Sequence, residues 1–181
     1  MNETEFVYRL NLAAPTREDF YQYELSDDYV SECIESYKCI EKENPTVLFT
    51  IENPIVRLLS LFDCKNVQIG NLKFLFKIVE REDYYEIGNV ELDILTINKI
   101  TFEIEVRDHD CITYIIWPVA SNASKFLDAM IISASFFTSK IKDPLLQEND
   151  TFALEKVNEC IDAAGGEIYG DFYKMLLGYF E

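Results

Sequence analysis

One short stretch of the sequence gathers several residue types that could do chemistry. It is Asp108-His109-Asp110-Cys111, and it contains the only histidine of the chain. Imidazole, carboxylate and thiolate groups all ligate metals, and a histidine can act as acid or base near neutral pH. Consecutive residues of an extended chain point to opposite faces, so at most two of these four side chains should converge. We expect a turn here, and a metal-assisted hydrolase using His109, Asp108 and Asp110 is the less favoured alternative.

The other nucleophile candidates lack the neighbours that catalysis needs. The five cysteines are scattered, odd in number and without a CxxC pair, which predicts reduced thiols and neither a zinc site nor a disulfide framework. The serines lack the glycine pattern of a nucleophile elbow, and neither a P-loop nor a GxGxxG motif is present. The sequence therefore predicts a protein that is not an enzyme, with no catalytic residue, cofactor or metal.

The chain is strongly acidic. It has 33 aspartates and glutamates against 16 lysines and arginines, a formal net charge of −17. This charge repels nucleic acid and anionic membranes and attracts a basic partner, although acidity also simply keeps a protein soluble. The acidic N-terminus lacks the features of a signal peptide, and no apolar run approaches the ~20 residues of a membrane span. We therefore expect a cytoplasmic protein with a protein partner.

The stretch Ile112–Phe137 is the expected centre of the fold. Its first part, Ile112–Val119, is β-branched and aromatic, which predicts a buried strand that stops pairing near Pro118. Ser121 or Asn122 can then cap a helix. Spacings of three and four place one set of apolar residues on a single helix face, which should make this helix the most buried one: Phe126, Leu127, Met130, Ile131, Ala134 and Phe137.

The remaining pattern predicts an α+β domain. Strand composition marks residues 67–70, 72–79, 84–87, 90–97, 100–106 and 112–117, with weaker strand patterns at 5–13 and 46–51. Capping signals at Thr16, Ser26, Asn53-Pro54 and Thr151 predict helices before and after the strands. We expect one domain over residues 1–181, with a mostly antiparallel central sheet of about five or six strands, helices packed on one side, and C-terminal helices.

Glycines and alternation give finer expectations within the sheet. Gly70 and Gly88 each precede an asparagine, and we expect positive φ there, at turns or bulges. Between residues 100 and 106, Ile100, Phe102, Ile104 and Val106 alternate with polar residues. That alternation predicts a strand whose wet, acidic face carries Glu103 and Glu105.

The order of parts in the second half resembles the SUKH superfamily. The strand pair EIGNVELDILTINKITFEIEV is followed by an acidic turn, a strand and then WPVASNASKFLDAMI. Superfamily members have a glycine-marked strand pair, a short link and a helix opened by small polar, serine and Phe-Leu positions. The corresponding residues here are Ala120, Ser121, Ser124, Phe126 and Leu127.

The tail is similar to the C-terminal extension of some bacterial members, with Asp162 followed by an aromatic helix that carries Phe172 and Tyr173. The resemblance covers roughly residues 67–180. Within residues 1–66, the segment 53–59 is similar to a helix common in the family, whereas the glycine-rich turn of the family is missing.

The resemblance implies a domain that acts by binding proteins and shares no catalytic residues with its relatives. Many bacterial members are thought to be immunity proteins that neutralise toxins, many of which are nucleases. It thus implies a cytoplasmic immunity protein that binds a basic toxin domain; the alternative is an intracellular adaptor without a toxin partner. The expected contact residues lie on the strand pair and its turns: Glu86, Glu91, Asp93, Glu103, Glu105, Asp108 and Asp110.

Overall fold

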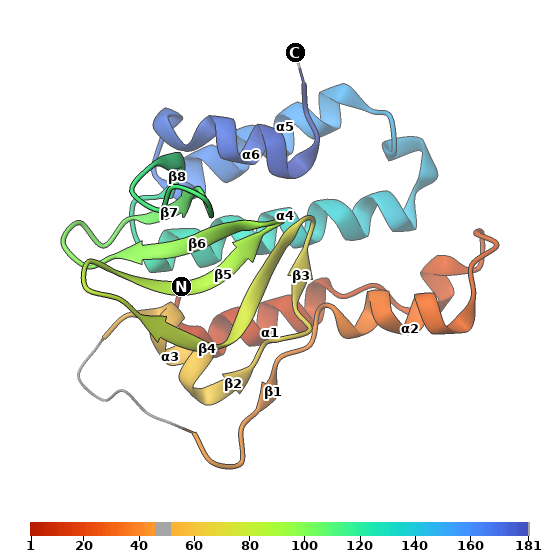
Figure 1. Cartoon of the computed structure of the whole chain (residues 1–181). Helices are drawn as coiled ribbons and strands as arrows, with labels where there is room; N and C mark the ends of the chain where they lie inside the picture. Colours follow the sequence, from red (N-terminus) through yellow and green to blue (C-terminus); the bar gives the residue numbers. More distant parts are fainter. Residues whose placement is uncertain (46–51, 181) are drawn as a thin grey trace.

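Six antiparallel strands form one sheet in which sequence neighbours are also spatial neighbours, in the computed structural model of residues 1–45 and 52–180 (Figure 1). The strand expected at residues 46–51 lies outside the described residues. Register shifts between β4 and β5, β5 and β6, and β7 and β8 bend the sheet. In chain order the strands are β3 (Gln68–Ile69), β4 (Leu72–Glu80), β5 (Tyr84–Val90), β6 (Asp93–Asn98), β7 (Ile104–Arg107) and β8 (Ile115–Ala120).

Helices precede and follow this sheet, which confirms the α+β class (Figure 1). A separate two-stranded sheet pairs β1 (Ile40–Glu41) with β2 (Phe62–Asp63). Within residues 1–45 and 52–180, three short 3-10 helices connect other elements: η1 (Arg17–Phe20), η2 (Pro144–Leu146) and η3 (Glu167–Tyr169). The α-helices are α1 (Glu3–Ala13), α2 (Asp27–Glu35), α3 (Pro54–Leu61), α4 (Ala123–Lys142), α5 (Asp150–Ala164) and α6 (Gly170–Leu177).

Helix α4 is the centre of the core, as the sequence predicts. The Asn122 side chain caps it by accepting a hydrogen bond from the Lys125 amide, 3.1 Å away. Five of the six predicted core residues are buried, and Phe137 is half-buried. Within the described residues, no other helix buries as many side chains. Phe74 of β4 meets Phe126 of α4 and Phe6 of α1 edge to face, so both helices cover the same face of the sheet.

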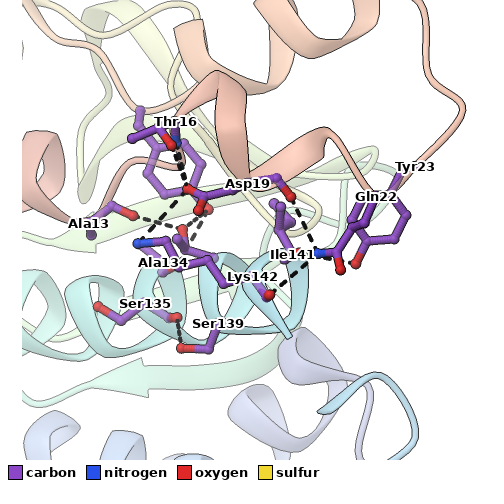
Figure 2. Close-up of polar contacts among 12 residues, drawn as sticks. Ala13, Thr16, Asp19, Gln22, Tyr23, Ala134, Ser135, Ser139, Ile141 and Lys142 are labelled. Atoms are coloured by element: carbon purple, nitrogen blue, oxygen red, sulfur yellow. Dashed lines mark hydrogen bonds and ion pairs between the residues drawn. The ribbon is translucent and has the colours of Figure 1, made fainter. Parts of the chain in front are cut away.

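The N-terminal segment is bound to the C-terminal half of α4 (Figure 2). The Gln22 amide and the Tyr23 hydroxyl both donate to the Ile141 carbonyl oxygen, at 2.9 and 3.0 Å. The Thr138 hydroxyl donates to the carbonyl of Ala13 at 2.7 Å. The last carbonyls of a helix have no partner inside it, so these contacts satisfy groups that would otherwise need water.

Two of the sequence expectations for helices are wrong. Residues 5–13 belong to α1 and not to a strand, because Phe6 and Leu10 are both buried one helical turn apart and Asn2 caps the first turn. Helix α5 begins at Asp150, and its cap is Asn149, two residues before the predicted cap Thr151. There the Asn149 side chain accepts from the Phe152 amide, and an asparagine caps as well as a threonine does.

The two glycines at which positive φ was expected, Gly70 and Gly88, differ in backbone conformation. Gly70 has a φ of +60°, as predicted for the β3–β4 turn. Gly88 does not have positive φ; it lies at a register shift, where a Cβ atom would be 2.5 Å from the Lys73 carbonyl oxygen. Glycine is needed at this position because the backbone of β4 lies too close for a side chain. The positive φ of this hairpin falls on Glu91, at 56°.

Pro118 lies inside β8 and does not end it, contrary to the sequence expectation. The strand can continue because β8 is the last strand of the sheet. An edge strand needs hydrogen-bond donors on one side only, so a proline is tolerated where the missing amide would face away from β7.

Candidate functional site

Acidic side chains gather at the end of the sheet where β6 begins and β7 ends. Ile94 pairs with Arg107, so the neighbouring Asp93 and Asp108 lie at the same end. The His109 Nδ1 atom is 2.9 Å from Asp93 Oδ1, and its Nε2 atom is 3.6 Å from Asp110 Oδ2. We call Asp93, Asp108, His109 and Asp110 the acidic sheet end.

A tight turn places these side chains together. Asp108 Oδ1 accepts hydrogen bonds from the backbone amides of Asp110 and Cys111, at 2.7 and 2.9 Å. An aspartate that bonds the amides two and three residues onward forms an Asx turn, so the expected turn is present. The expectation that at most two of the side chains of 108–111 converge on a metal is confirmed, because of these four only Asp108 and His109 belong to the group whose ligand atoms lie within 4.8 Å of one another. In the turn, His109 lies close to the carboxylates on both sides of it.

The histidine is held in an acidic environment. The hydrogen bond with Asp93 raises the pKa of His109 above its ordinary value, and the charges of Asp110, Asp93 and Asp108 act in the same direction. When protonated, His109 balances only part of the charge of the three carboxylates. The acidic sheet end therefore remains negative on both sides of the histidine pKa.

The same groups could hold a metal ion. Ligand atoms of Asp93, Asp108 and His109 all lie within 4.8 Å of one another. Oxygen and imidazole ligands suit several divalent cations. However, Asp93 Oδ1 already accepts from the backbone and ring of His109, and Asp108 Oδ1 accepts from two backbone amides. The negative charge of the group can still attract a cation. That cation is either a metal ion or a lysine or arginine side chain of a partner.

Glu91 is the fourth predicted carboxylate at this end of the sheet. It is exposed on the turn between β5 and β6, next to the start of β6. Its side chain accepts a hydrogen bond from Asn71 at 3.3 Å, which leaves its charge without an ion-pair partner among the described residues.

The other three predicted residues are engaged inside the protein. Glu86 pairs with Arg81 at 2.6 Å. Glu103 accepts a hydrogen bond from the Tyr169 hydroxyl at 3.0 Å, and burial together with this carboxylate raises the pKa of Tyr169 to about 12. Glu105 is only 4% exposed and pairs with Arg107 at 2.6 Å. The charges of Glu86 and Glu105 are thus balanced within the protein, and Glu103 is held by the Tyr169 hydroxyl.

The prediction that Glu103 and Glu105 share an exposed strand face is therefore wrong. Strand β7 begins at Ile104, because Asn98 accepts hydrogen bonds from the amides of Ile100 and Thr101 and so forms a turn. Ile100 is consequently 81% exposed and Phe102 58% exposed, although both were expected to be buried. Sequence alternation alone could not show where the turn gives way to the strand.

The Glu105–Arg107 pair is a feature that sequence analysis missed. Glu105 also accepts from the Asn98 amide at 3.1 Å, and the Arg107 guanidinium lies 4.8 Å from the centre of the Tyr84 ring. Arg107 further donates to the Ile112 carbonyl at 3.2 Å, which attaches the loop after β7 to the sheet. The only sequence signal for this pair was that Glu105 and Arg107, which have opposite charges, are two residues apart and so lie on the same face of a strand.

A cavity of about 720 Å³ lies near the N-terminal ends of α3 and α4. Its potential positive groups are already used: Asn53 and Asn122 cap the two helices, and Lys99 pairs with Glu80 at 2.8 Å. Among its described lining residues, the cavity therefore offers no uncompensated positive charge to a ligand. The lining residues come from distant segments: Glu52, Asn53, Pro54, Tyr85, Lys99, Phe102, Asn122, Ala123 and Ser124.

No family model, curated protein or solved structure matches this chain. In the part of the chain that the structure describes, no helix is both long and apolar enough to cross a membrane. What the protein binds must therefore be judged from the geometry of its surface.

Proposed function

We propose that the chain is a non-catalytic protein-binding domain that receives a basic partner at the acidic sheet end. One observation carries the proposal. Asp93, Asp108 and Asp110 gather around His109, and no lysine or arginine of residues 1–45 and 52–180 forms an ion pair with them. Glu86 and Glu105, in contrast, each have an arginine partner. Carboxylates whose charge is not balanced by a lysine or arginine of the same protein are available to cationic groups of another protein.

The partner that fits best is a basic toxin domain. The resemblance to SUKH immunity proteins supports a toxin as the partner class, and nucleases in particular tend to be basic because they approach phosphates. The net charge of −17 favours rapid capture of such a domain. The protein would act in the cytoplasm, where it would occupy the surface that the toxin presents to its nucleic acid.

Genomic context and binding together test this proposal. A toxin gene directly upstream is expected, and its product should form a stable complex with the purified chain. The double variant Glu91→Lys/Asp110→Lys changes the two exposed carboxylates at this end of the sheet and leaves the Asx turn of Asp108 intact. We expect association to slow by roughly tenfold or more.

The matched control is Glu155→Lys/Asp162→Lys, which makes the same change in charge at exposed positions of α5. If both double variants slow association equally, only net charge matters and the acidic sheet end is not the contact surface. A genome without a neighbouring toxin, together with a stable complex with another intracellular protein, would instead support the adaptor.

The ligand spacing of Asp93, Asp108 and His109 favours one competing function, a metal-assisted hydrolase. Elemental analysis of the purified protein separates the two. A stoichiometric divalent metal that is lost in His109→Ala would support the hydrolase, whereas toxin binding that persists in a chelator would support the protein-binding domain.

A further inference from the structure

Two cysteines lie opposite each other at the end of the small two-stranded sheet. In β1 and β2, Ile40 is opposite Asp63 and Glu41 is opposite Phe62. One further step in the same register places Cys39 opposite Cys64. Their sulfur atoms are 3.2 Å apart, and the Cys64 thiol donates a hydrogen bond to the Cys39 sulfur. The residues are 25 apart in the chain, so only the pairing of β1 with β2 brings them together.

The register suits a covalent bond between them. The Lys42 amide donates to the Leu61 carbonyl at 2.9 Å, so this pair is hydrogen-bonded. Hydrogen-bonded and non-hydrogen-bonded pairs alternate along an antiparallel ladder, which makes Cys39 and Cys64 a non-hydrogen-bonded pair. Opposite residues of that kind have Cα atoms about 4.5 Å apart, within the roughly 4.4–6.8 Å range of disulfides. Side-chain rotation can therefore close the gap without moving the backbone.

The two thiols differ in access to solvent. Cys64 is fully buried, whereas Cys39 is half-buried. The hydrogen bond to Cys39 and burial raise the pKa of the Cys64 thiol far above its usual range. Lys42, whose amino group donates to the carbonyls of Leu59 and Phe76, acts in the opposite direction on the Cys64 thiol and does not offset the rise of its pKa. Cys39 is the more accessible sulfur of the pair and is therefore the one that an oxidant reaches first.

We propose that Cys39 and Cys64 are a reversible redox pair that hydrogen peroxide converts into a disulfide. The Cys39 thiolate attacks one peroxide oxygen, the O–O bond breaks, and the leaving hydroxide takes a proton, which gives a sulfenic acid and one water. The Cys64 sulfur then attacks the Cys39 sulfur. The S–O bond breaks, and the departing hydroxide takes the Cys64 proton as a second water. Two thiols lose two electrons, and one peroxide gains them.

The disulfide would stabilise the weakest sheet of the domain. Strands β1 and β2 have two residues each, and isolated two-stranded sheets are marginally stable. A bond between residues 39 and 64 would close a loop that contains α3, whose buried Ile55, Leu58 and Leu59 belong to the core. The oxidised protein should therefore resist unfolding better than the reduced protein. In a reducing compartment, such pairs are typically transient and regulatory. This inference does not depend on the identity of the partner.

Peptide mapping after oxidation tests the proposal directly. The reduced protein is treated with stoichiometric hydrogen peroxide, unfolded and alkylated, and its free thiols should fall from five to three. Trypsin releases Cys39 in residues 39–42 and Cys64 in residues 58–65. These two peptides should appear joined, with the mass of two hydrogens lost, and should separate again with dithiothreitol. The thermal midpoint of the oxidised protein should rise by roughly 5–10 °C.

Two single variants complete the test. Cys39→Ser should abolish both the joined peptide and the peroxide-dependent rise of the thermal midpoint. Cys111→Ser removes the exposed cysteine and should change neither. The proposal is overturned if peroxide oxidises Cys111 or links two chains while the peptides with Cys39 and Cys64 stay separate. It is equally overturned if the joined peptide forms only after the protein has unfolded.

Discussion

The carboxylate of Glu105 and the guanidinium of Arg107 are 2.6 Å apart, and their side chains are only 5% and 11% exposed. Both residues lie on β7, on the face opposite the buried Ile104 and Val106. The pair shows that an acidic residue on this face of β7 can be bound within the protein and so is not always available to a partner. Glu105 is part of the structure, and the charge available to a partner lies at the end of the sheet instead.

Replacing Arg107 with methionine should destabilise the domain by about 3 kcal/mol or more, because Glu105 would remain as a buried charge without its partner. Urea unfolding measures the loss. Arg17→Met is the matched control, since the Arg17–Asp27 pair is exposed and should contribute under about 1 kcal/mol. Equal losses in the two variants would mean that water reaches Glu105 in solution. Glu105→Lys is expected to unfold the domain and is unsuitable as a test of binding.

Replacing Phe126 with alanine should cost roughly 3–5 kcal/mol, since its ring is fully buried between the sheet and α4 and contacts Phe74. The change in the free energy of unfolding is measured by chemical denaturation. Leu145→Ala removes an exposed side chain and should cost under about half a kcal/mol. A loss at Phe126 as small as this would show that α4 is not the centre of the core.

His109 should titrate with a pKa above its ordinary value of 6.5, because Asp93 stabilises the protonated form. A raised pKa in the folded state means that the stabilisation is present at low pH and is lost as the pH rises through the folded pKa. Nuclear magnetic resonance can follow the ring directly. In Asp93→Asn, the pKa should move back toward the ordinary value. An unchanged pKa would indicate that the contact with Asp93 does not form in solution.

Association with a basic partner should slow steeply with salt if the acidic sheet end steers the encounter. Screening shortens the reach of exposed charges from ~10 Å at 0.1 M to ~3 Å at 1 M salt. Stopped-flow mixing with the toxin domain gives the association rate. The Glu91→Lys/Asp110→Lys variant should depend less on salt than the α5 control variant does. An association rate that is independent of salt would indicate that the acidity of the chain serves only to keep it soluble.

Protonation of His109 should also weaken binding. As the pH falls through the raised pKa, the acidic sheet end gains one positive charge and attracts a basic partner less strongly. His109→Gln cannot gain this charge, so its affinity should change less over the same pH range. Isothermal titration of both proteins with the toxin domain, at pH values on either side of the His109 pKa, makes the comparison. Identical pH dependence of the two proteins would exclude His109 from the interface.

The sequence by itself determined the class of the fold, the approximate positions of the six strands and the identity of α4. These features follow from local physics: the period of apolar residues, the capping asparagine at 122 and the buried spacing of Phe126 and Leu127 are contained within a few neighbouring residues. The same local rules misassigned residues 5–13, where a short and weak alternation competed with a helical spacing of four.

Only the tertiary structure decided which charged and reactive groups meet. Asp93 reaches His109, and Cys39 reaches Cys64, through strand register, which a sequence pattern does not specify. The turn at Asn98 decided where β7 starts and therefore exposed Phe102. The period of a sequence pattern indicates on which face of a helix or strand a side chain lies. What covers that face depends on residues far away in the chain. For this reason the sequence identified the acidic residues of the strand pair. It could not show which of them pair with an arginine inside the protein and which keep an unbalanced charge.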